Sequence, residues 1–210
     1  MATAGNVAGG GKYADLKRRA LFLALALVVY RIGTHIPVPL IDPEQFRRFF
    51  DSKQGGLLGM FDLFAGGATS RFSIFAIGIM PYITASIVMQ MLTYVLPSFE
   101  AMRKEGESGR RRITQYTRYA AVGVALVQAY AAVVVFEGTA IEPGPVFRLV
   151  GVCSLVTGSM FLMWLGEQIT ERGLGNGISI IIFSGIAAGL LNALGPVSYT
   201  HLTLPTNREV

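Results

Sequence analysis

The sequence has few of the residues on which enzymes and metal proteins rely. Its 210 residues include one cysteine and two histidines. Cys153 lies inside an apolar block, so we expect it to be a small buried hydrophobe and neither a disulfide partner nor a metal ligand. Ser179 resembles a membrane serine nucleophile, but His35 lies at the end of an apolar block and His201 in a polar tail. We therefore expect no catalytic site, no metal and no cofactor.

Charge is also scarce. Charged residues make up 15% of the chain and hydrophobic residues 52%, and the mean hydropathy is +0.50. Such a composition is typical of a membrane protein. The apolar residues form blocks long enough to cross about 30 Å of hydrocarbon at about 1.5 Å per residue. The five blocks are residues 20–37, 72–96, 119–136, 149–166 and 178–194. The sequence thus predicts an all-α polytopic membrane protein with five transmembrane helices.

The first block is the weakest of the five, because Arg31 and His35 interrupt it near one end. Arg31 can extend its charged group to the membrane interface there. No small-residue cleavage site follows the block, so we expect a retained first span and not a cleaved signal peptide. Residues 1–19 then form a tail that precedes the first span.

Basic residues near the span ends predict the orientation. Eleven of the 18 Lys and Arg residues fall in the N-terminal tail, in the loop after the second block or in the loop after the fourth. Because cytoplasmic loops are enriched in Lys and Arg, we expect these segments in the cytoplasm. The basic loop after the second block contains Arg103, Lys104, Arg110, Arg111 and Arg112. With a pI of 9.6 it also suits nucleic acid, but membrane topology explains the same charges and we expect no nucleic-acid partner.

A short apolar segment, LLGMFDLFAGG at residues 57–67, lies on the opposite side between the first two spans. It is too short to cross a bilayer, and glycines bound it at both ends. A re-entrant element of this kind is tolerated at membrane depth only where it lines protein or a water-filled cavity. A helix resting on the outer surface explains the residues equally well.

The second block carries a proline at its centre, in GIMPYITASI at residues 78–87. Pro81 removes a backbone donor and predicts a kink in the helix. Thr84, with serine and glutamine further along, forms a polar seam of the kind that faces other helices or a water-filled path. Ile79 and Ile83 are four residues apart and share one face. The pattern indicates a helix that forms one wall of a pathway able to open.

The fifth block repeats part of this pattern. The run GLGNGISIII places Ile178 and Ile182 four residues apart after a stretch rich in glycine. The glycines fit neither the dinucleotide nor the P-loop spacing, so we interpret them as a turn and a helix start. A solute carrier built from five-span repeats and a membrane scaffold that binds partners through its basic loop are the alternatives to a channel. A carrier usually has an ionisable residue at mid-membrane or a span broken at its midpoint, and the interiors of the last three blocks carry no charge.

Several long stretches resemble the SecY family, whose members are central subunits of the bacterial protein translocation channel. They are YRIGTHIPVPLID, MFDLFAGGATSRFSIFAIGIMPYITASIVMQ, KEGESGRRRITQYTRY and SLVTGSMFLMWLGEQITERGLGNGISIII. The resemblance runs nearly continuously from about Leu16 to about Leu194. It implies that residues 20–194 form the five-span N-terminal half of a pseudo-symmetric ten-helix channel that moves unfolded secretory polypeptides across, and membrane segments into, the bacterial plasma membrane. A half channel is not expected to translocate by itself.

The resemblance also implies roles for particular residues. The aliphatic pore ring matches Ile79, Ile83, Ile178 and Ile182. The plug helix that closes the pore matches residues 57–67, with apolar side chains from Leu57, Leu58, Met60, Phe61, Leu63 and Phe64. The lateral gate matches the second and third spans, with polar positions at Thr84 and Gln128, and Pro81 is a plausible bend in the moving helix. The implied partners are SecE, SecG, the SecA motor or the ribosome, signal sequences and translocating polypeptides, and membrane lipid.

The end of the chain departs from the family. The polar stretch VSYTHLTLPTNREV at residues 197–210 resembles nothing in the family at that point. We therefore interpret residues 195–210 as a foreign tail and assign no function to them.

Overall fold

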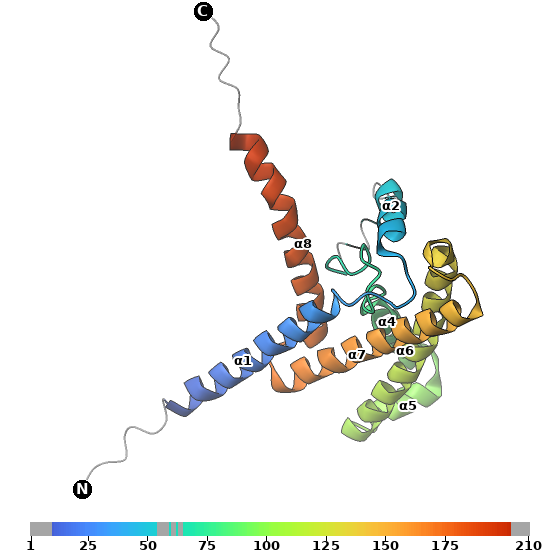
Figure 1. Cartoon of the computed structure of the whole chain (residues 1–210). Coiled ribbons are helices and arrows are strands. Elements are labelled where there is room, and N and C mark those ends of the chain that lie inside the picture. The colour runs from blue at the N-terminus through green and yellow to red at the C-terminus, as the bar shows by residue number, and fades with distance from the viewer. Residues whose placement is uncertain (1–9, 54–58, 60–61, 63–64, 203–210) are drawn as a thin grey trace, which may run out of the picture.

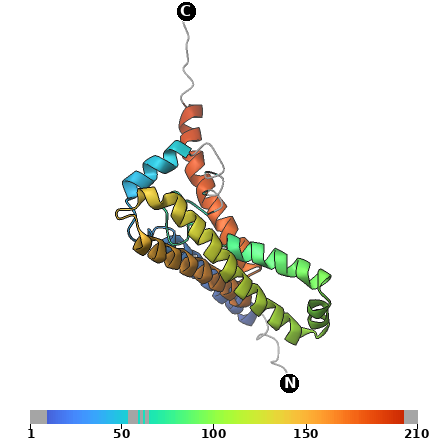
Figure 2. The same cartoon turned by 90° about the vertical axis from the view of Figure 1, so that its right-hand side faces the viewer.

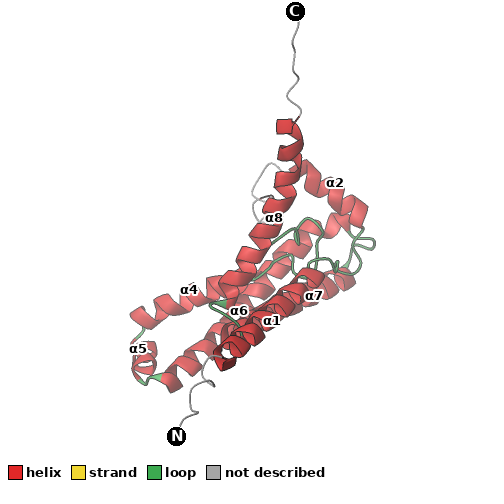
Figure 3. Cartoon of the chain, turned by 90° about the vertical axis from the view of Figure 1, so that its left-hand side faces the viewer, coloured by secondary structure: helices red, strands yellow, loops and turns green. Residues whose placement is uncertain are grey.

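The computed structural model describes residues 10–53, 59, 62 and 65–202, and all regular structure in these residues is helical, as predicted (Figure 3). The elements are α1 (Gly10–Gly33), α2 (Pro43–Lys53), α4 (Met80–Val95), α5 (Pro97–Lys104), α6 (Glu107–Phe136), the 3-10 helix η1 (Glu137–Thr139), α7 (Pro145–Arg172) and α8 (Gly177–Leu202). Extended pairing in this part of the chain is limited to two isolated bridges, between Pro37 and Ser73 and between Ile41 and Ala140.

The helices form an elongated bundle from which α8 extends (Figure 1). The helices α4, α5 and α6 make a hairpin whose turn is α5, and α6 runs antiparallel to α7 (Figure 2). Helix α1 packs along α7, and α8 begins against the end of α7. The start of α1 and the end of α8 therefore lie at opposite ends of the molecule (Figure 1).

Small residues bring α6 close to its neighbours. Ala121, Ala125 and Ala129 repeat every four residues on α6 and are fully buried, and so is Val133 at the next position. On α7, a Cβ atom added at Gly151 would lie 2.9 Å from Val133 Cγ2. Stripes of small residues let helix backbones approach closely, which is the usual way that helices pack in a membrane.

An aromatic cap closes the end of the bundle where α2 lies beside η1. The Phe46 ring of α2 lies 5.2 Å from the Phe72 ring and 5.1 Å from the Phe136 ring, measured between centroids. Phe46 and Phe72 are almost fully buried. The cap therefore fixes the loop before α4 against the end of α6.

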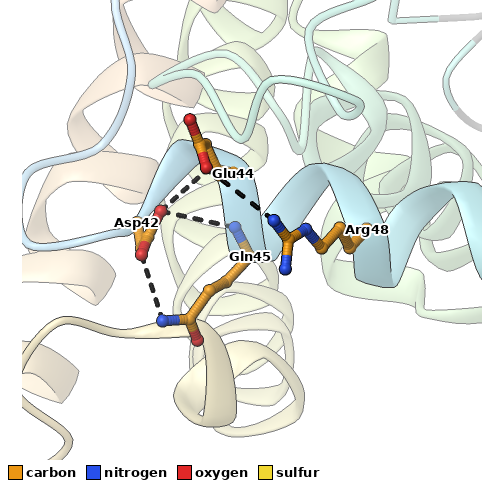
Figure 4. Close-up of polar contacts among 4 residues, drawn as sticks. All are labelled: Asp42, Glu44, Gln45 and Arg48. Atoms are coloured by element: carbon orange, nitrogen blue, oxygen red, sulfur yellow. Dashed lines mark hydrogen bonds and ion pairs between the residues drawn. The ribbon is translucent and has the colours of Figure 1, made fainter.

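Asp42 caps the first turn of α2 (Figure 4). One oxygen of its carboxylate accepts hydrogen bonds from the backbone N–H groups of Glu44 at 2.9 Å and Gln45 at 3.3 Å, and the other accepts one from Gln45 Nε2 at 3.0 Å. These bonds, those from the backbone first, hold the pKa of Asp42 below its ordinary value. Glu44 also pairs with Arg48 one turn later, at 4.0 Å.

The basic loop predicted between the second and third spans is largely helical, and its position in the cytoplasm stays a prediction. Arg103 and Lys104 lie in the last turn of α5, and Arg110, Arg111 and Arg112 lie in the first two turns of α6. All five are exposed. Ion pairs four residues apart favour these turns, with Glu100 to Lys104 at 2.7 Å and Glu107 to Arg111 at 3.7 Å.

By length and composition, two helices in the described part of the chain can cross a membrane, Glu107–Thr139 and Pro145–Arg172. A third counts if α4 and α5, bent by 96° at their junction, form one broken span. The apolar part of α8, Gly177–Gly189, is shorter. The structure thus supports two or three of the five predicted spans, and the count of five stays a prediction.

Candidate functional site

The start of α4 differs from the predicted span. Residues 72–79 form turns, and the helix begins only at Met80. Pro81 therefore lies in the first helical turn, where its ring meets no carbonyl of a preceding turn and its missing N–H leaves no helical bond unmade. The predicted kink at Pro81 is wrong, because Pro81 begins the helix and does not bend it.

The turns before α4 have backbone partners of their own. The Ile74 N–H donates to the Ile36 carbonyl at 3.0 Å, and the Gly78 N–H donates to the Phe75 carbonyl at 2.8 Å. The Thr69 hydroxyl donates to the Ala76 carbonyl at 3.1 Å. Non-helical backbone is tolerated within an apolar region only when such bonds are made. These bonds hold Ile79 in place just before the helix.

The start of α8 agrees with the prediction from the glycine run. Gly175 has a φ of +72°, which favours glycine, and makes the turn. The Asn176 side-chain oxygen accepts a hydrogen bond from the Ile178 N–H at 3.0 Å, and the Thr170 hydroxyl oxygen accepts one from the Gly177 N–H at 2.9 Å. These two side chains satisfy donors of the first turn, so the run is a turn and a helix start, as predicted.

The two helix starts meet at one pocket, which we call the isoleucine pocket. Its volume is about 310 Å³, and Ile79, Ile83 and Ile182 lie in its wall. The remaining lining residues are Ala65, Ala76, Ile77, Gly78 and Met80. None of these lining residues has a charged side chain or a strong hydrogen-bonding group, so the described wall is apolar.

Ile178 joins the same cluster from the side of α7. A Cβ atom added at Gly166 would lie 3.2 Å from Ile178 Cγ1 and 3.6 Å from Ile79 Cδ1. Gly166 thus lets isoleucines from two helices approach one position of α7. The structure brings the four predicted ring residues together, and their role as a pore ring stays a prediction.

The predicted gate residues are less closely associated. Pro81 is buried, Thr84 is exposed and Gln128 on α6 is half-buried. The Thr84 hydroxyl donates to the Met80 carbonyl of its own helix at 3.0 Å. Thr84 therefore bonds within its own helix, and both the polar seam of the gate and its pairing with Gln128 stay predictions.

The predicted plug falls largely outside the described residues. This applies to the six apolar side chains assigned to it, Leu57, Leu58, Met60, Phe61, Leu63 and Phe64. The structure describes the end of the segment, where the Asp62 carboxylate accepts a hydrogen bond from the Ser70 N–H at 2.7 Å. Ala65, one of the pocket residues, directly precedes two glycines with positive φ.

Sequence reasoning missed two residues that contact this end of the segment. The Tyr30 hydroxyl donates to the Ala65 carbonyl at 3.3 Å, and Arg31 Nη1 donates to the Gly66 carbonyl at 3.0 Å. Arg31 is a half-buried residue whose guanidinium is bound to backbone, and its extension toward the membrane interface stays a prediction. The signal available in the sequence was the presence of a cation at the end of an apolar helix.

Cys153 is free and exposed, so its predicted burial is wrong. Helix α7 buries Gly151 and Leu155, and Cys153 lies between them on another face. There it lines an apolar groove of about 600 Å³ with residues of α1, α7 and the turns before α4. In the described part of the chain, no cluster of three or more His, Cys, Asp or Glu side chains can hold a metal ion.

One ion pair ties α6 to α7 near the isoleucine pocket. Arg118 Nε donates to Glu167 Oε1 at 2.9 Å, and Nη2 lies 2.9 Å from Oε2. The paired fork geometry is the strongest form of this contact. Glu167 is one residue after Gly166, so the pair fixes the part of α7 that the isoleucines touch.

The sequence model of the SecY family matches residues 73–207, which is more than half of the chain. This chain belongs to the SecY family. It is 54% identical over 187 residues to the protein translocase subunit SecY of Pseudomonas aeruginosa and 53% identical over 190 residues to that of Escherichia coli K12. These alignments cover 88% of this chain but only 42% and 43% of the relatives. The chain therefore spans less than half the length of these curated relatives.

Solved SecY and Sec61 channels share the fold. Sec61 in the canine ribosome–channel complex superposes with a TM-score of 0.62 at 20% identity, over 82% of this chain and 36% of that one. A second structure, described as a SecY protein whose plug domain stabilises the closed state, has a TM-score of 0.58 at 22% identity over the same shares. At these identities the likeness shows the fold alone.

Proposed function

We propose that this SecY-family chain supplies the N-terminal part of a protein-conducting channel that moves unfolded polypeptides across, and membrane segments into, the bacterial plasma membrane. The observation that carries the proposal is the isoleucine cluster at the pocket, where Ile79 and Ile83 at the start of α4 meet Ile178 and Ile182 of α8 although about 100 residues separate the pairs in the sequence. A dry aliphatic constriction resists ions and gives no sequence-specific hold on a passing chain. The SecY relatives are named protein translocase subunits, which supports the proposal.

The remaining assignments complete this proposal. Ile79, Ile83, Ile178 and Ile182 form half of the pore ring, and residues 57–67 form the plug. Helices α4 and α6 form one side of the lateral gate, with Thr84 and Gln128 on its polar seam. The five predicted spans make up one half of a ten-helix channel, and no step of the proposed function requires catalysis.

The proposed partners are SecE, SecG, signal sequences, membrane lipid, and either the SecA motor or the ribosome. One of the solved structures is a Sec61 channel in complex with a ribosome, which supports the last of these. The tail, the basic segment of α5 and α6, and the connection between α7 and α8 with Arg172 face the cytoplasm in this proposal, because together they hold eleven of the 18 Lys and Arg residues.

The solute-carrier alternative gains no support from the pocket. A carrier needs polar or ionisable groups to bind a small ion or solute. The pocket's lining residues offer only aliphatic side chains, methionine and glycine. Uptake of a small solute by the reconstituted full-length protein would count against the channel.

The origin of residues 195–210 remains a separate proposal. Helix α8 continues to Leu202, and the family match extends to residue 207. Sequencing the parent gene past the codon for Leu194 decides whether the natural reading frame contains this segment. A native frame through residue 210 would refute a foreign tail.

Crosslinking to a stalled secretory chain tests the channel. In the full-length channel, with Cys153 replaced by serine to remove the exposed native thiol, Ile79→Cys and Ile83→Cys should form disulfides with a cysteine in the stalled chain. Val127→Cys is the matched control, because Val127 is 72% exposed on α6, away from the buried alanines. Crosslinks at position 127 but at neither isoleucine would refute the pore-ring assignment.

A further inference from the structure

Two adjacent side chains at the end of α1 bind consecutive backbone carbonyls of one turn. Tyr30 is only 3% exposed, its ring stacks on Phe75 at 6.2 Å, and its hydroxyl donates to the Ala65 carbonyl. Arg31, a half-buried residue, donates from Nη1 to the Gly66 carbonyl. We call the bonded residues the Ala65–Gly66 turn. A half-buried cation needs such a partner, and a bond from a charged donor is roughly twice as strong as a neutral one.

The end of α1 is itself held in place, so it can act as a fixed support. The Thr34 hydroxyl donates to the Arg31 carbonyl at 2.7 Å, and His35 Nδ1 lies 2.9 Å from the same oxygen. A Cβ atom at Gly33 would overlap the Phe75 ring, so α1 lies directly against the turns before α4. Tyr30 and Arg31 therefore project from a helix end that has little freedom to shift.

The other side of the Ala65–Gly66 turn lies against α8. Gly66 has a φ of +65°, and a Cβ atom there would lie 2.9 Å from Gly185 Cα and 3.3 Å from its carbonyl oxygen. Gly185 is three residues after Ile182 on α8. The turn is thus held between the bonds from α1 and the helix that carries one of the pocket isoleucines.

Ala65 is also part of the isoleucine pocket, where it lies with Ile79, Ile83 and Ile182. We propose that Tyr30 and Arg31 are positioning residues, which hold the Ala65–Gly66 turn against α8 so that Ala65 occupies one side of the pocket. This positioning is a property of the fold. Its consequence, that the two bonds oppose the passage of a polypeptide between the isoleucines, rests on the proposed channel function.

Thiol accessibility at position 65 tests the positioning. The full-length channel carries Ala65→Cys with Cys153→Ser, and the rate of reaction with a membrane-impermeant maleimide is measured. Tyr30→Phe keeps the ring stack and removes one bond, so the rate should rise about fivefold. Arg31→Gln removes the charged donor, so the rate should rise about tenfold, and Arg31→Lys should recover part of the difference.

Two matched controls separate positioning from general loosening. Tyr119→Phe also removes one tyrosine hydroxyl, at a site that is 73% exposed on α6, and should leave the rate at position 65 unchanged. A cysteine at Val127 should react at the same rate in every variant. Equal rates at position 65 in all variants overturn the proposal, and so do rates that rise equally at positions 65 and 127.

A second measurement covers the case in which Ala65→Cys does not fold. The ion conductance of the resting channel should increase in Tyr30→Phe and Arg31→Gln and stay unchanged in Tyr119→Phe. No increase in either of the first two, in a channel that does form the crosslinks at the isoleucines, overturns the proposal. Crosslinking to the stalled chain is measured on the same preparations. Altered thiol rates without any crosslink at the isoleucines would refute the channel and leave the positioning of the turn intact.

Discussion

Two regions of this chain bury apolar side chains in opposite ways. Where α6 meets α4 and α7, alanines are fully buried and the Val133 side chain packs directly against Gly151, so the helices are in close contact. Where α4 and α8 begin, large isoleucines meet but leave a pocket of about 310 Å³. Small residues therefore give a tightly packed helix interface in one region of the chain, whereas the large isoleucines in the other region leave a space between them. The difference locates the part of the fold in which side chains can shift at low cost.

The packed interface should give the largest effect. Ala125→Leu adds three carbon atoms at a fully buried position of α6, and overpacking of this kind destabilises by about 2 to 3 kcal/mol. Thermal unfolding of the full-length protein in detergent measures the loss. Val127→Leu, which also introduces a leucine on α6 but at an exposed position, should have little effect, and equal unfolding temperatures for the two variants would remove the distinction between the regions.

The ion pair at the edge of the packed interface should give an intermediate effect. Glu167→Gln leaves Arg118 without its carboxylate, and since Glu167 is 17% exposed and Arg118 43% exposed, the loss should be about 1 kcal/mol. A double-mutant cycle with Arg118→Gln isolates the contribution of the pair. Additive losses in the cycle would show that the pair does not couple α6 to α7.

The isoleucine pocket should tolerate added volume. Ile182→Phe places a larger side chain next to an existing space, so the free energy of unfolding should change by less than about 1 kcal/mol. The same thermal assay measures this change. A loss as large as that of Ala125→Leu would mean that the pocket is filled or rigid, and the comparison between the regions would fail.

The smallest effect concerns Asp42, which caps the first turn of α2, and this effect depends on pH. Hydrogen bonds from Glu44 and Gln45 lower the pKa of Asp42 in the folded state, so the stabilisation is present above the ordinary pKa and is lost as pH falls through the lowered one. Hydrogen-exchange protection of the first turn of α2 should decrease on acidification. Asp42→Asn keeps an acceptor that does not titrate, so its protection should be insensitive to pH over that range.

The sequence predicted those features that depend on local pattern. The all-helical architecture follows from long apolar blocks, and the turn before α8 follows from its glycines and Asn176. The four-residue spacing of the isoleucines indicated shared faces, although only the family resemblance related Ile79 to Ile178. Local periodicity describes one helix at a time and contains no information about which helix lies opposite.

The features that were missed depend on contacts remote in sequence. Residues 72–79 are as apolar as α4, so hydropathy cannot show that their backbone bonds go to Ile36 and Thr69. Pro81 predicts an interruption wherever it occurs, but whether it bends or begins a helix depends on that preceding stretch. Arg31 gave no sign of its partner, because the Gly66 carbonyl is 35 residues away.

The turns before α4 have an implication for the order of synthesis. Ile74 donates to Ile36, Phe72 accepts from Val38, and the Ala76 carbonyl accepts from Thr69. Each of these partners lies earlier in the chain, so a ribosome completes it before it completes the turn that needs it. A segment entering the bilayer alone would leave these groups unpaired or would coil into a longer helix. Vectorial synthesis instead delivers the turns to partners that already exist, and a circular permutant that begins at residue 70 would lose this advantage.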